Sequence, residues 1–439
     1  MYRIKDLHDG GEHDLNTIGD IIKDFRLQQN ISRLDIEQFT KVNQSVLWKI
    51  ENGKTKKPEY KTIKPVATHL NIPYHEILES FKDENRIFVL KDLLEDAIEL
   101  NDKNAVLTVS QLVLKSGQVS IENRLDFLLS QASEVKTIEI ALDLYDLLLK
   151  EARVNEMNRL VAKIELERYL IGRDNFSQLR ETYNRGCKIL DYITFLDLNE
   201  QIIFYYKIGV HAYNLSLFED CINHCTKSIE KDNTESEMKA KAVFAICNSY
   251  IFIGEYDMAE EYLALYMNFP FYNVTGKTLL TRGTLDAKNG LFESAIKKFM
   301  KCLTLKDPDI TIHAVNELFR IYLQTGEYKK IAQLIDFEDE MFKYKLTPRK
   351  AMEKANYYRL KAEYQIEIGL FDKGVIDYID SALLYGKVNA YSFSFESLQK
   401  ISALYIEQGK QMEISVLKKL NALYNDLYTL SSSSGGRCI

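Results

Sequence analysis

The feature that most constrains this chain is a sequence segment that recurs through its C-terminal half. Four stretches align with one another, at residues 249–266, 286–303, 320–335 and 364–382. Each has a helix-forming run, a glycine, an aromatic residue two positions later, and a small or aliphatic residue three positions after that. Self-similarity of this kind is typical of stacked supersecondary units, so it predicts a repeat array rather than one compact core.

A turn residue marks each copy of the repeat. An earlier copy over residues 206–228 has Ser216 at this position instead of glycine. Each copy predicts two antiparallel helices, which cannot bury their apolar faces alone and must therefore stack on their neighbours. The turn glycines are separated by 36, 36, 43 and 40 residues, and they are Gly254, Gly290, Gly326, Gly369 and Gly409.

Composition agrees with a helical chain. The 439 residues include only 19 glycines and 6 prolines, so residues that break helices are scarce. Residues 88–200 also have helical patterning, and they predict further helix pairs that are more divergent. We therefore expect an all-α fold.

The repeat signature resembles a known family of helical repeats. Gly254-Tyr256-Ala259 and Gly290-Phe292-Ala295 match the turn glycine, aromatic and alanine positions of the tetratricopeptide repeat. The resemblance implies a right-handed superhelix over residues 81–430 that holds ligands in its concave groove and contributes to dimerisation.

The first eighty residues follow a different pattern. Ile18, Ile21, Ile22 and Phe25 have the spacing of an amphipathic helix. Ser32 is placed to cap a second helix, with Asp35 at the third helical position of a capping box. This second helix is expected to bury Ile36 and Phe39, and Val42 is expected to fill the space before the next helix.

A third short helix follows almost at once. Asn43 can cap it, Asn52-Gly53 can end it, and Val46, Leu47 and Ile50 are its apolar residues. A fourth helix is expected after Pro58, and Ile72-Pro73 opens a fifth. Two short helices joined by so tight a turn predict a helix-turn-helix, whose second helix enters the DNA major groove.

This stretch resembles the XRE/Cro-type family of phage repressors and their bacterial relatives. The residues that carry the resemblance are IGDIIKDFR (18–26), NQSVLWKIENGK (43–54) and a T-I-x-x-V-A-x-x-L helix ending in NIP. The resemblance implies a structural pair between Arg26 and Glu51. Two positions depart from the family: Glu37 replaces a small residue, and Trp48 replaces a polar one.

The same resemblance implies the DNA-contacting residues of a domain over residues 17–80. Gln44, Ser45 and Lys49 would read base edges, since glutamine suits adenine and lysine suits guanine. Trp48 could touch the DNA backbone or stack on a neighbouring subunit. Arg33, Asn52 and Lys54 would contact phosphates, and Asn43 begins the same helix.

Charge is divided unevenly between these regions. The whole chain carries a net charge of −7, but residues 17–80 contain ten lysines and arginines against eight acidic residues. That leaves +2 on this segment and −9 on the rest of the chain. A basic module on an acidic body favours contact with nucleic acid through the module alone.

Candidate metal and catalytic sites have simpler explanations. Cys221, His224 and Cys225 share a helix face and could bind a metal, but both cysteines stand where the repeat requires small packing residues. Cys247 and Cys302 have the same interpretation. The sequence contains no nucleotide-binding or hydrolase motif. We therefore expect no metal, no cofactor and no catalytic residue.

A helix-turn-helix followed by tetratricopeptide repeats resembles the RRNPP family of peptide-sensing regulators. The resemblance implies a homodimeric, quorum-sensing transcription regulator that binds an operator in double-stranded DNA and is controlled by a short signalling peptide in its groove. Amide side chains on inner helices can grip an extended peptide, and basic ones can bind its carboxylates. The candidates are Asn214, Asn248, Asn316 and Asn356, with Lys207, Lys241, Arg320 and Arg359.

Other functions remain open at this stage. The N-terminal module could have become a docking domain that no longer reads DNA. The repeat domain could instead be a protein-interaction adaptor that sequesters a signalling protein such as a response regulator. An enzyme acting on a phosphorylated aspartate is a third class, which no set of residues motivates. Each groove asparagine, taken singly, could also be an ordinary solvated surface residue.

The ends of the chain bear on its location. Residues 1–16 form an acidic extension without the apolar core of a signal peptide, and no stretch has the roughly 18 apolar residues of a membrane helix. We therefore expect a cytoplasmic protein that does not enter a membrane. Residues 431–439 are expected to be a flexible or expression-derived tail.

Overall fold

The computed structural model describes residues 17–175, 178–271, 273–342 and 347–433. Throughout these ranges the regular structure is helical and no strand is present, which confirms the predicted all-α fold. The chain divides into two compact units, the first ending at Arg168 and the second beginning at Tyr169. The predicted extension over residues 1–16 and residues 434–439 of the predicted tail lie outside the described residues.

The first unit begins with five short helices, whose local sequence signals are visible in the structure. Asp35 donates its backbone N–H to Ser32 Oγ at 3.1 Å, and Ser32 donates its own to Asp35 Oδ2 at 2.9 Å, which confirms the capping box. Asn43 Oδ1 accepts from Ser45 N at 2.9 Å. The helices are α1 (Ile18–Gln28), α2 (Arg33–Thr40), α3 (Gln44–Glu51), α4 (Tyr60–His69) and α5 (Tyr74–Ser80).

The core of these helices follows the predicted periodicity with two corrections. Ile36 and Leu47 are fully buried. Phe39 was expected in the core, but it is 74% exposed, because its ring stacks on His69 of α4, with a distance of 4.9 Å between the ring centroids, instead of packing among the buried apolar residues. Val46 is 38% exposed, since it lies about 100° around α3 from Leu47.

Five further helices complete the first unit, and α6 packs on α4. The carboxylate of Asp96, a largely buried residue of α6, accepts hydrogen bonds from Tyr60 and Lys64 of α4. Arg86 donates to the carbonyl oxygens of Lys57 and Pro58, at 3.1 Å each. The N-terminal helices are thus joined to the following ones, which are α6 (Ile87–Glu99), α7 (Lys103–Lys115), α8 (Ile121–Ala132), α9 (Ile138–Val154) and α10 (Asn158–Gly172), whose end belongs to the second unit.

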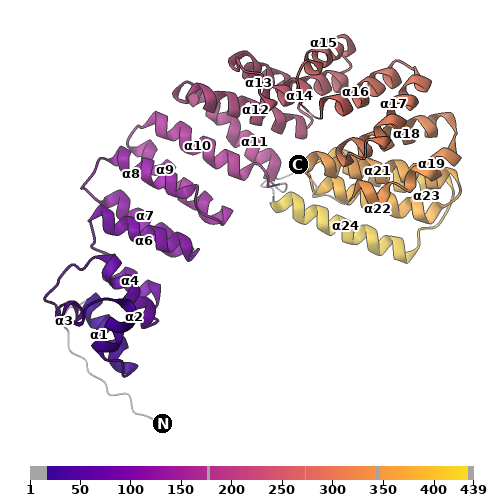
Figure 1. Cartoon of the computed structure of the whole chain (residues 1–439). Coiled ribbons are helices and arrows are strands. Elements are labelled where there is room, and N and C mark those ends of the chain that lie inside the picture. The colour runs from indigo at the N-terminus through magenta and orange to yellow at the C-terminus, as the bar shows by residue number, and fades with distance from the viewer. Residues whose placement is uncertain (1–16, 176–177, 272, 343–346, 434–439) are drawn as a thin grey trace. The chain divides into compact units, whose positions relative to one another are not determined.

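The second unit consists of paired helices that pack in chain order (Figure 1). Neighbours from α12 to α18 contact each other in sequence, and α22 packs between α21 and α23. The helices are α11 (Leu179–Cys187), the 3₁₀ helix η2 (Lys188–Phe195), α12 (Leu198–Asn214), α13 (Phe218–Lys231), α14 (Glu237–Ile253), α15 (Tyr256–Met267), α16 (Val274–Lys288), α17 (Phe292–Thr304), α18 (Pro308–Thr325), α19 (Tyr328–Ile335), α20 (Glu338–Met341), α21 (Pro348–Glu367), α22 (Phe371–Gly386), α23 (Tyr391–Glu407) and α24 (Ile414–Ser433).

The turn positions were predicted correctly. The five turn glycines have φ between +59° and +87°, and Ser216 has φ +60°. This left-handed conformation ends the first helix of each pair, and glycine adopts it without the steric cost that a Cβ adds. The periodic glycines therefore mark backbone turns, as their spacing indicated.

Small residues allow the paired helices to approach closely. A Cβ on Gly209 of α12 would lie 2.5 Å from Cys225 Sγ of α13, so only glycine fits there. Cys221 and Cys225 are fully buried, with their sulfur atoms 4.0 Å apart. Both cysteines pack in the core, and no group of three or more potential metal ligands occurs in the part of the chain that the structure describes.

Two further observations concern the end of the chain and membranes. The helix α24 continues to Ser433, so residues 431–433 of the predicted tail are helical. Among the described residues, no helix is both long enough and apolar enough to cross a bilayer.

Candidate nucleic-acid interface and ligand pocket

The predicted recognition helix α3 presents a polar face to solvent. Gln44, Ser45, Trp48, Lys49 and Asn52 are all exposed, and their spacing places them on one side of α3 and its C-terminal end. The opposite side is buried through Leu47, Ile50 and Glu51. The amphipathic pattern of these eight residues therefore orients the predicted base-reading side chains outward.

Two predicted contact residues also cap this helix. Asn43 accepts from Ser45 at the first turn and donates to Glu37 Oε1 at 2.8 Å. Asn52 Nδ2 donates to the carbonyl oxygen of Trp48 at 2.8 Å. Glu37, which departs from the XRE/Cro-type pattern, thus holds the residue that caps the predicted recognition helix α3.

A buried ion network lies beneath the exposed face. Glu51, whose side chain is fully buried, accepts from Arg26 Nε at 2.6 Å and Arg26 Nη2 at 3.0 Å, which confirms the predicted pair. Arg33, predicted to contact phosphate, also donates to Glu51, through Nε at 2.7 Å. Its side chain remains 32% exposed, so Arg33 has a structural partner and a solvent-facing edge.

Four exposed lysines on and beside α3 have no acidic ion-pair partner among the residues that the structure describes. Lys49 lies on the helix itself, and Lys54, Lys56 and Lys57 follow in the next loop, where all are exposed. None of these four forms an ion pair with any residue that the structure describes. Uncompensated lysines next to an exposed polar helix suit contact with the phosphates that flank a major groove.

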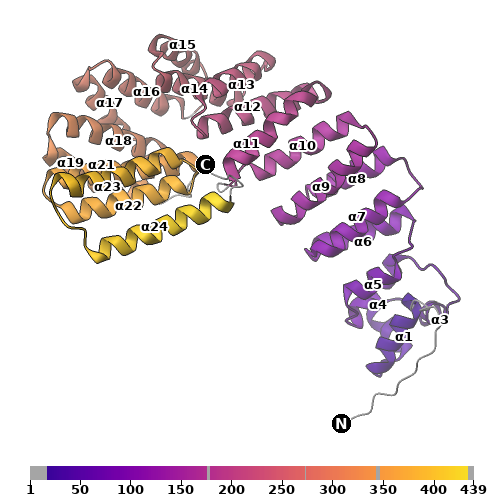
Figure 2. The ribbon, with the colours of Figure 1, turned by 180° about the vertical axis from the view of Figure 1, so that it is seen from behind.

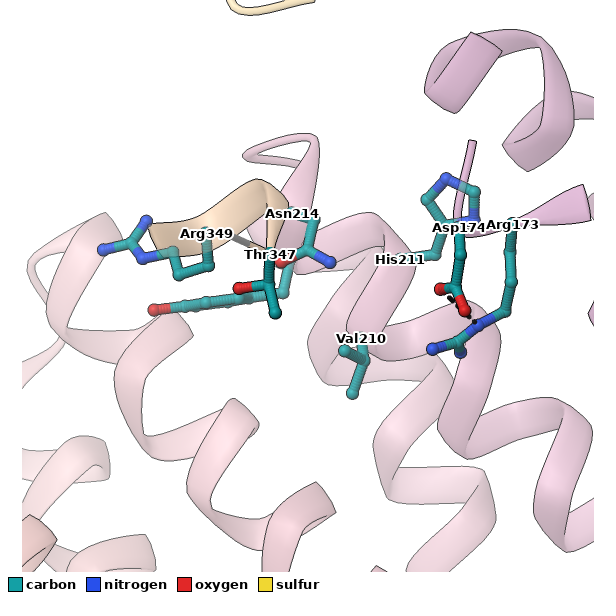
Figure 3. Close-up of a pocket in the computed structure, with 8 residues that line it drawn as sticks. Arg173, Asp174, Val210, His211, Asn214, Thr347 and Arg349 are labelled. Carbon is teal, nitrogen blue, oxygen red and sulfur yellow. Dashed lines mark ion pairs between the residues drawn. The ribbon is translucent and has the colours of Figure 1, made fainter. Parts of the chain in front are cut away.

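A cavity of about 350 Å³ lies in the second unit (Figure 3). It joins the end of α12 to the start of α21, although these elements are far apart in the sequence. Asn214, Thr347 and Arg349 gather at one end of it, and Arg173, Asp174 and His211 at the other. Val210 and Tyr213 complete the lining.

The charged groups of the cavity are balanced. Arg173 Nε lies 3.4 Å from Asp174 Oδ1, and Arg349 Nη2 lies 2.6 Å from Glu353 Oε1. The guanidinium carbon of Arg349 also lies 5.2 Å from the ring centre of Tyr213. A cavity with two guanidinium groups, a carboxylate and an amide offers partners for both the carbonyl and the charged groups of a peptide.

His211 contributes a neutral wall to this cavity. Its Nδ1 lies 3.2 Å from the hydroxyl of Tyr169, and its ring stacks on the Tyr169 ring with a centroid separation of 5.9 Å. Burial lowers the pKa of His211 to about 4. The imidazole is therefore uncharged near pH 7, and Asp174 and the two arginines carry the cavity's charges.

The predicted peptide-binding residues are dispersed relative to this cavity. Of the eight, Asn214 lines it and the other seven do not. Asn316 is almost fully buried, and its Nδ2 donates at 3.0 Å to both the carbonyl oxygen and Oε2 of Glu353. Burial lowers the pKa of Lys207, whose ammonium lies 5.5 Å from the ring centre of Tyr206.

The remaining predicted residues bond within their own helices. Asn248 donates to the carbonyl oxygen of Phe244 at 3.0 Å, and Arg359 donates to Asn356 Oδ1 at 3.2 Å. The others pair with acidic residues one turn away: Lys241 with Glu237 at 2.9 Å, and Arg320 with Glu317.

Seven of the eight residues that line the cavity were missed by sequence reasoning, among them Arg173, Thr347 and Arg349. Arg173 stands after a helix without a clean repeat signature, and Thr347 and Arg349 precede and begin α21. One signal was available, since Thr347 followed by Pro348 is a typical helix start. Nothing in the sequence indicated that this helix start meets the end of α12.

Comparisons with known proteins give little further information. No family model matches the chain, and no curated protein matches it. Among solved structures, it is similar to a Rap protein complexed with competence and sporulation factor, with 12% identity over 77% of this chain and 99% of that chain and a TM-score of 0.41. It is also similar to Bacillus thuringiensis PlcR in complex with the peptide PapR7 and DNA, with 15% identity over 58% of this chain and 95% of that chain and a TM-score of 0.25. Both TM-scores lie below 0.5, and neither structure assigns a family, a ligand or a partner to this chain.

Proposed function

We propose that this protein is a cytoplasmic transcription regulator that binds operator DNA through α3 and is controlled by a short signalling peptide held in its second unit. The observation that carries the proposal is the exposed face of α3, with Gln44 and Lys49 directed outward and uncompensated lysines beside it. The sequence resemblance to XRE/Cro-type modules supports the same assignment. Binding as a homodimer is part of the proposal, because such modules read paired half-sites.

The peptide component rests on the cavity in the second unit. A free peptide has a carboxylate, an ammonium group and a row of amides, and the cavity offers Arg349, Asp174 and Asn214 as their counterparts. An allosteric effect requires that the peptide bind one conformation of the regulator more tightly than another. We therefore place the peptide against the end of α12 and the start of α21.

Selection from a random-sequence DNA duplex library tests the DNA component. The wild-type chain is expected to enrich one sequence, and Gln44→Ala with Lys49→Ala to bind it about 10- to 100-fold more weakly, as loss of base contacts predicts. Gln28→Ala with Lys61→Ala is the matched control, because both residues are exposed and lie outside α3. Equal enrichment by the α3 variant would show that this face does not read bases.

Mass spectrometry of small peptides retained by the protein from its native host tests the peptide component. Asn214→Ala with Thr347→Ala is expected to release the peptide, whereas Asn248→Ala is expected to retain it because Asn248 lies outside the cavity. Retention by the cavity variant would place the ligand elsewhere.

A protein-interaction adaptor is the second candidate, and a specific observation favours it. Apolar side chains are unusually exposed on the N-terminal helices, with Phe39 at 74%, Leu34 at 51% and Trp48 at 46%. Apolar side chains that are exposed to solvent favour contact with a protein partner over contact with DNA phosphates. Co-purification of a stoichiometric protein that Phe39→Ser releases, together with no DNA binding at low salt, would favour the adaptor.

A further inference from the structure

The segment that follows α3 carries three exposed lysines on a backbone that its own residues hold only in part. Residues 53–57 lead from α3 towards α4, and we call them the lysine loop. Its exposed lysines are Lys54, Lys56 and Lys57. The amides of Lys54 and Thr55 donate to the carbonyl oxygen of Lys49, at 2.8 and 3.2 Å. Over residues 56–59, no amide donates to another backbone group in the part of the chain that the structure describes.

Arg86, which precedes α6, holds the C-terminal end of this loop. Its Nη1 donates to the carbonyl oxygen of Lys57 and its Nη2 to that of Pro58, at 3.1 Å each. The two acceptors are consecutive carbonyl groups, so the planar fork of a guanidinium can bind both at once. A lysine at this position would present a single ammonium group and could not reproduce this pair of bonds.

A buried carboxylate fixes the orientation of Arg86. Glu84 is 8% exposed, and it accepts from Arg86 Nε at 3.0 Å and from Arg86 Nη2 at 2.5 Å. The same carboxylate accepts from the backbone amides of Asn85 and Arg86, at 2.9 and 2.8 Å. Glu84 therefore sets both the side chain and the backbone of Arg86.

The segment around Arg86 is itself attached to the end of α7. Ser116, which is 2% exposed, donates through Oγ to the carbonyl oxygen of Asn85 at 2.8 Å. Gln118 Oε1 accepts from the amide of Ile87 at 3.1 Å. Both ribbon views show α4 next to α6 in this part of the unit (Figures 1 and 2). A continuous set of hydrogen bonds therefore leads from the turn after α7 to the lysine loop.

We propose that Arg86 is a positioning residue for DNA phosphates: it holds the lysine loop in the conformation that contacts the DNA backbone, and the turn after α7 holds Arg86. The inference rests on the proposed DNA binding through α3 and adds to it the element that controls the phosphate contacts. Lysines on a fixed backbone lose less conformational freedom on binding than lysines on a mobile one. Arg86 acts without touching DNA, since each of its side-chain nitrogens already donates within the protein.

The salt dependence of DNA binding separates phosphate contacts from base contacts. The full-length chain is titrated at several salt concentrations with the duplex that it enriches and with a scrambled duplex. Arg86→Ala is expected to weaken both complexes about tenfold and to make the slope of log affinity against log salt shallower by about 2. The ratio of the two affinities should change less than about twofold, because Gln44 and Lys49 keep their base contacts. A general loosening of the N-terminal helices would lower that ratio as well.

Two variants control for the loss of charge. Arg153→Ala removes the same charge from an exposed pair with Glu165 on other helices of the unit, and it should keep the slope of the wild type. Arg86→Lys keeps the charge but cannot bind both carbonyl groups, so it should behave like Arg86→Ala. A wild-type slope in Arg86→Lys would mean that the charge of Arg86 acts on DNA directly, and it would overturn the positioning role.

A combined variant tests whether Arg86 acts through the lysines. In a chain that carries Lys54→Ala, Lys56→Ala and Lys57→Ala, adding Arg86→Ala should reduce the affinity further by less than about twofold, because no lysine remains to be positioned. A further tenfold loss in that chain would show that Arg86 affects DNA binding by another route.

Hydrogen exchange tests the positioning itself in the absence of DNA. The amides of Lys54 and Thr55 should exchange about tenfold faster in Arg86→Ala, with a smaller acceleration in Ser116→Ala, while the exchange of α1 and α2 stays unchanged. Unchanged exchange of the loop in Arg86→Ala would overturn the inference. Unchanged exchange in Ser116→Ala alone would exclude the connection to α7.

The outcomes distinguish this inference from the function on which it rests. A wild-type chain that binds no duplex contradicts the proposed function, whatever Arg86→Ala does to the exchange of the loop. A wild-type chain that binds its duplex with a steep salt dependence, which Arg86→Ala then retains, leaves the proposed function in place and overturns the role of Arg86.

Discussion

Each of the two regions to which we assign function contains a buried glutamate with several side-chain partners, and the two glutamates differ in which helices they connect. Glu51 of α3 binds two arginines that precede it in the sequence by 25 and 18 residues. Glu353 of α21 binds Arg349 one turn away, and it also contacts His313 at 3.4 Å and Asn316 at 3.0 Å on α18. We call both glutamates anchors because each binds several side chains. Glu51 connects helices within the N-terminal module, whereas Glu353 connects α21 to α18 in the preceding repeat.

The difference determines what remains available to a ligand. The Glu51 network lies below α3 and leaves the outward face of that helix free. The Glu353 network instead engages Asn316, which we had expected to face a peptide, and holds Arg349, which lines the cavity. The partners of a polar residue therefore decide whether it remains available: Asn316 is engaged in packing, whereas Arg349 pairs with Glu353 and still lines the cavity.

The largest predicted effect is the loss of the first anchor. Glu51→Gln removes the charge that two guanidinium groups share in a buried site, and we expect the N-terminal helices to lose about 3 kcal/mol of stability. Hydrogen exchange of α1 to α3 measures this loss directly, because it reports local opening. DNA binding should fall with it.

A surface substitution provides the control for this experiment. Lys49→Ala changes an exposed residue of the same helix, so it should alter the stability of α3 by less than about 0.5 kcal/mol while weakening DNA binding. If Glu51→Gln left the exchange of α3 unchanged, the anchor role assigned to Glu51 would be wrong.

A smaller effect is expected for Glu353→Gln, because this carboxylate is 11% exposed and keeps some solvent. We expect a loss of about 2 kcal/mol at pH 7, read from hydrogen exchange in α18 and α21. Glu317→Gln, which alters a partly buried pair with Arg320 on α18, should cost less than about 1 kcal/mol, because both side chains keep access to solvent.

The effect of Glu353→Gln should also depend on pH. Burial alone would raise the pKa of Glu353, but the charges of His313 and Arg349 hold it well below the ordinary value of 4.5. The unfolded chain therefore binds this proton first, and the stabilisation is complete above about pH 4.5 and lost as pH falls further. Wild type and variant should converge in acid; a constant difference down to pH 3 would contradict this linkage.

These two regions also show which structural features could be predicted from the sequence and which could not. The helices of the N-terminal module, its caps and the Arg26–Glu51 pair were predicted because each depends on residues close in sequence or fixed by a specific motif. Phe39 was wrongly placed in the core, because helical period alone does not show where a core ends.

The cavity in the second unit was beyond such reasoning. It forms where the end of α12 meets the start of α21, more than 130 residues later in the chain. Periodicity predicted the helices and their turns, but the choice of helix faces that meet across several repeats depends on packing angles that no short motif encodes. Asn214 was identified because it occupies a position on an inner helix of the repeats, whereas Arg349 was not identified.

The smallest predicted effect concerns the turns that periodicity did predict. Gly254 and Ser216 occupy equivalent turns with φ of +87° and +60°, and no atom lies within 4 Å of the position that a Cβ on Gly254 would take. Any cost of a side chain at this turn is therefore conformational rather than steric against neighbours. Gly254→Ala should lower the stability of α14 and α15 by about 1 kcal/mol, and Ser216→Gly should raise that of α12 and α13 by about 0.5 kcal/mol. If hydrogen exchange shows that the two substitutions change local stability in opposite directions, the repeat preserves the left-handed turn conformation and not the glycine spacing as such. If both substitutions change it in the same direction, the two turns are not equivalent.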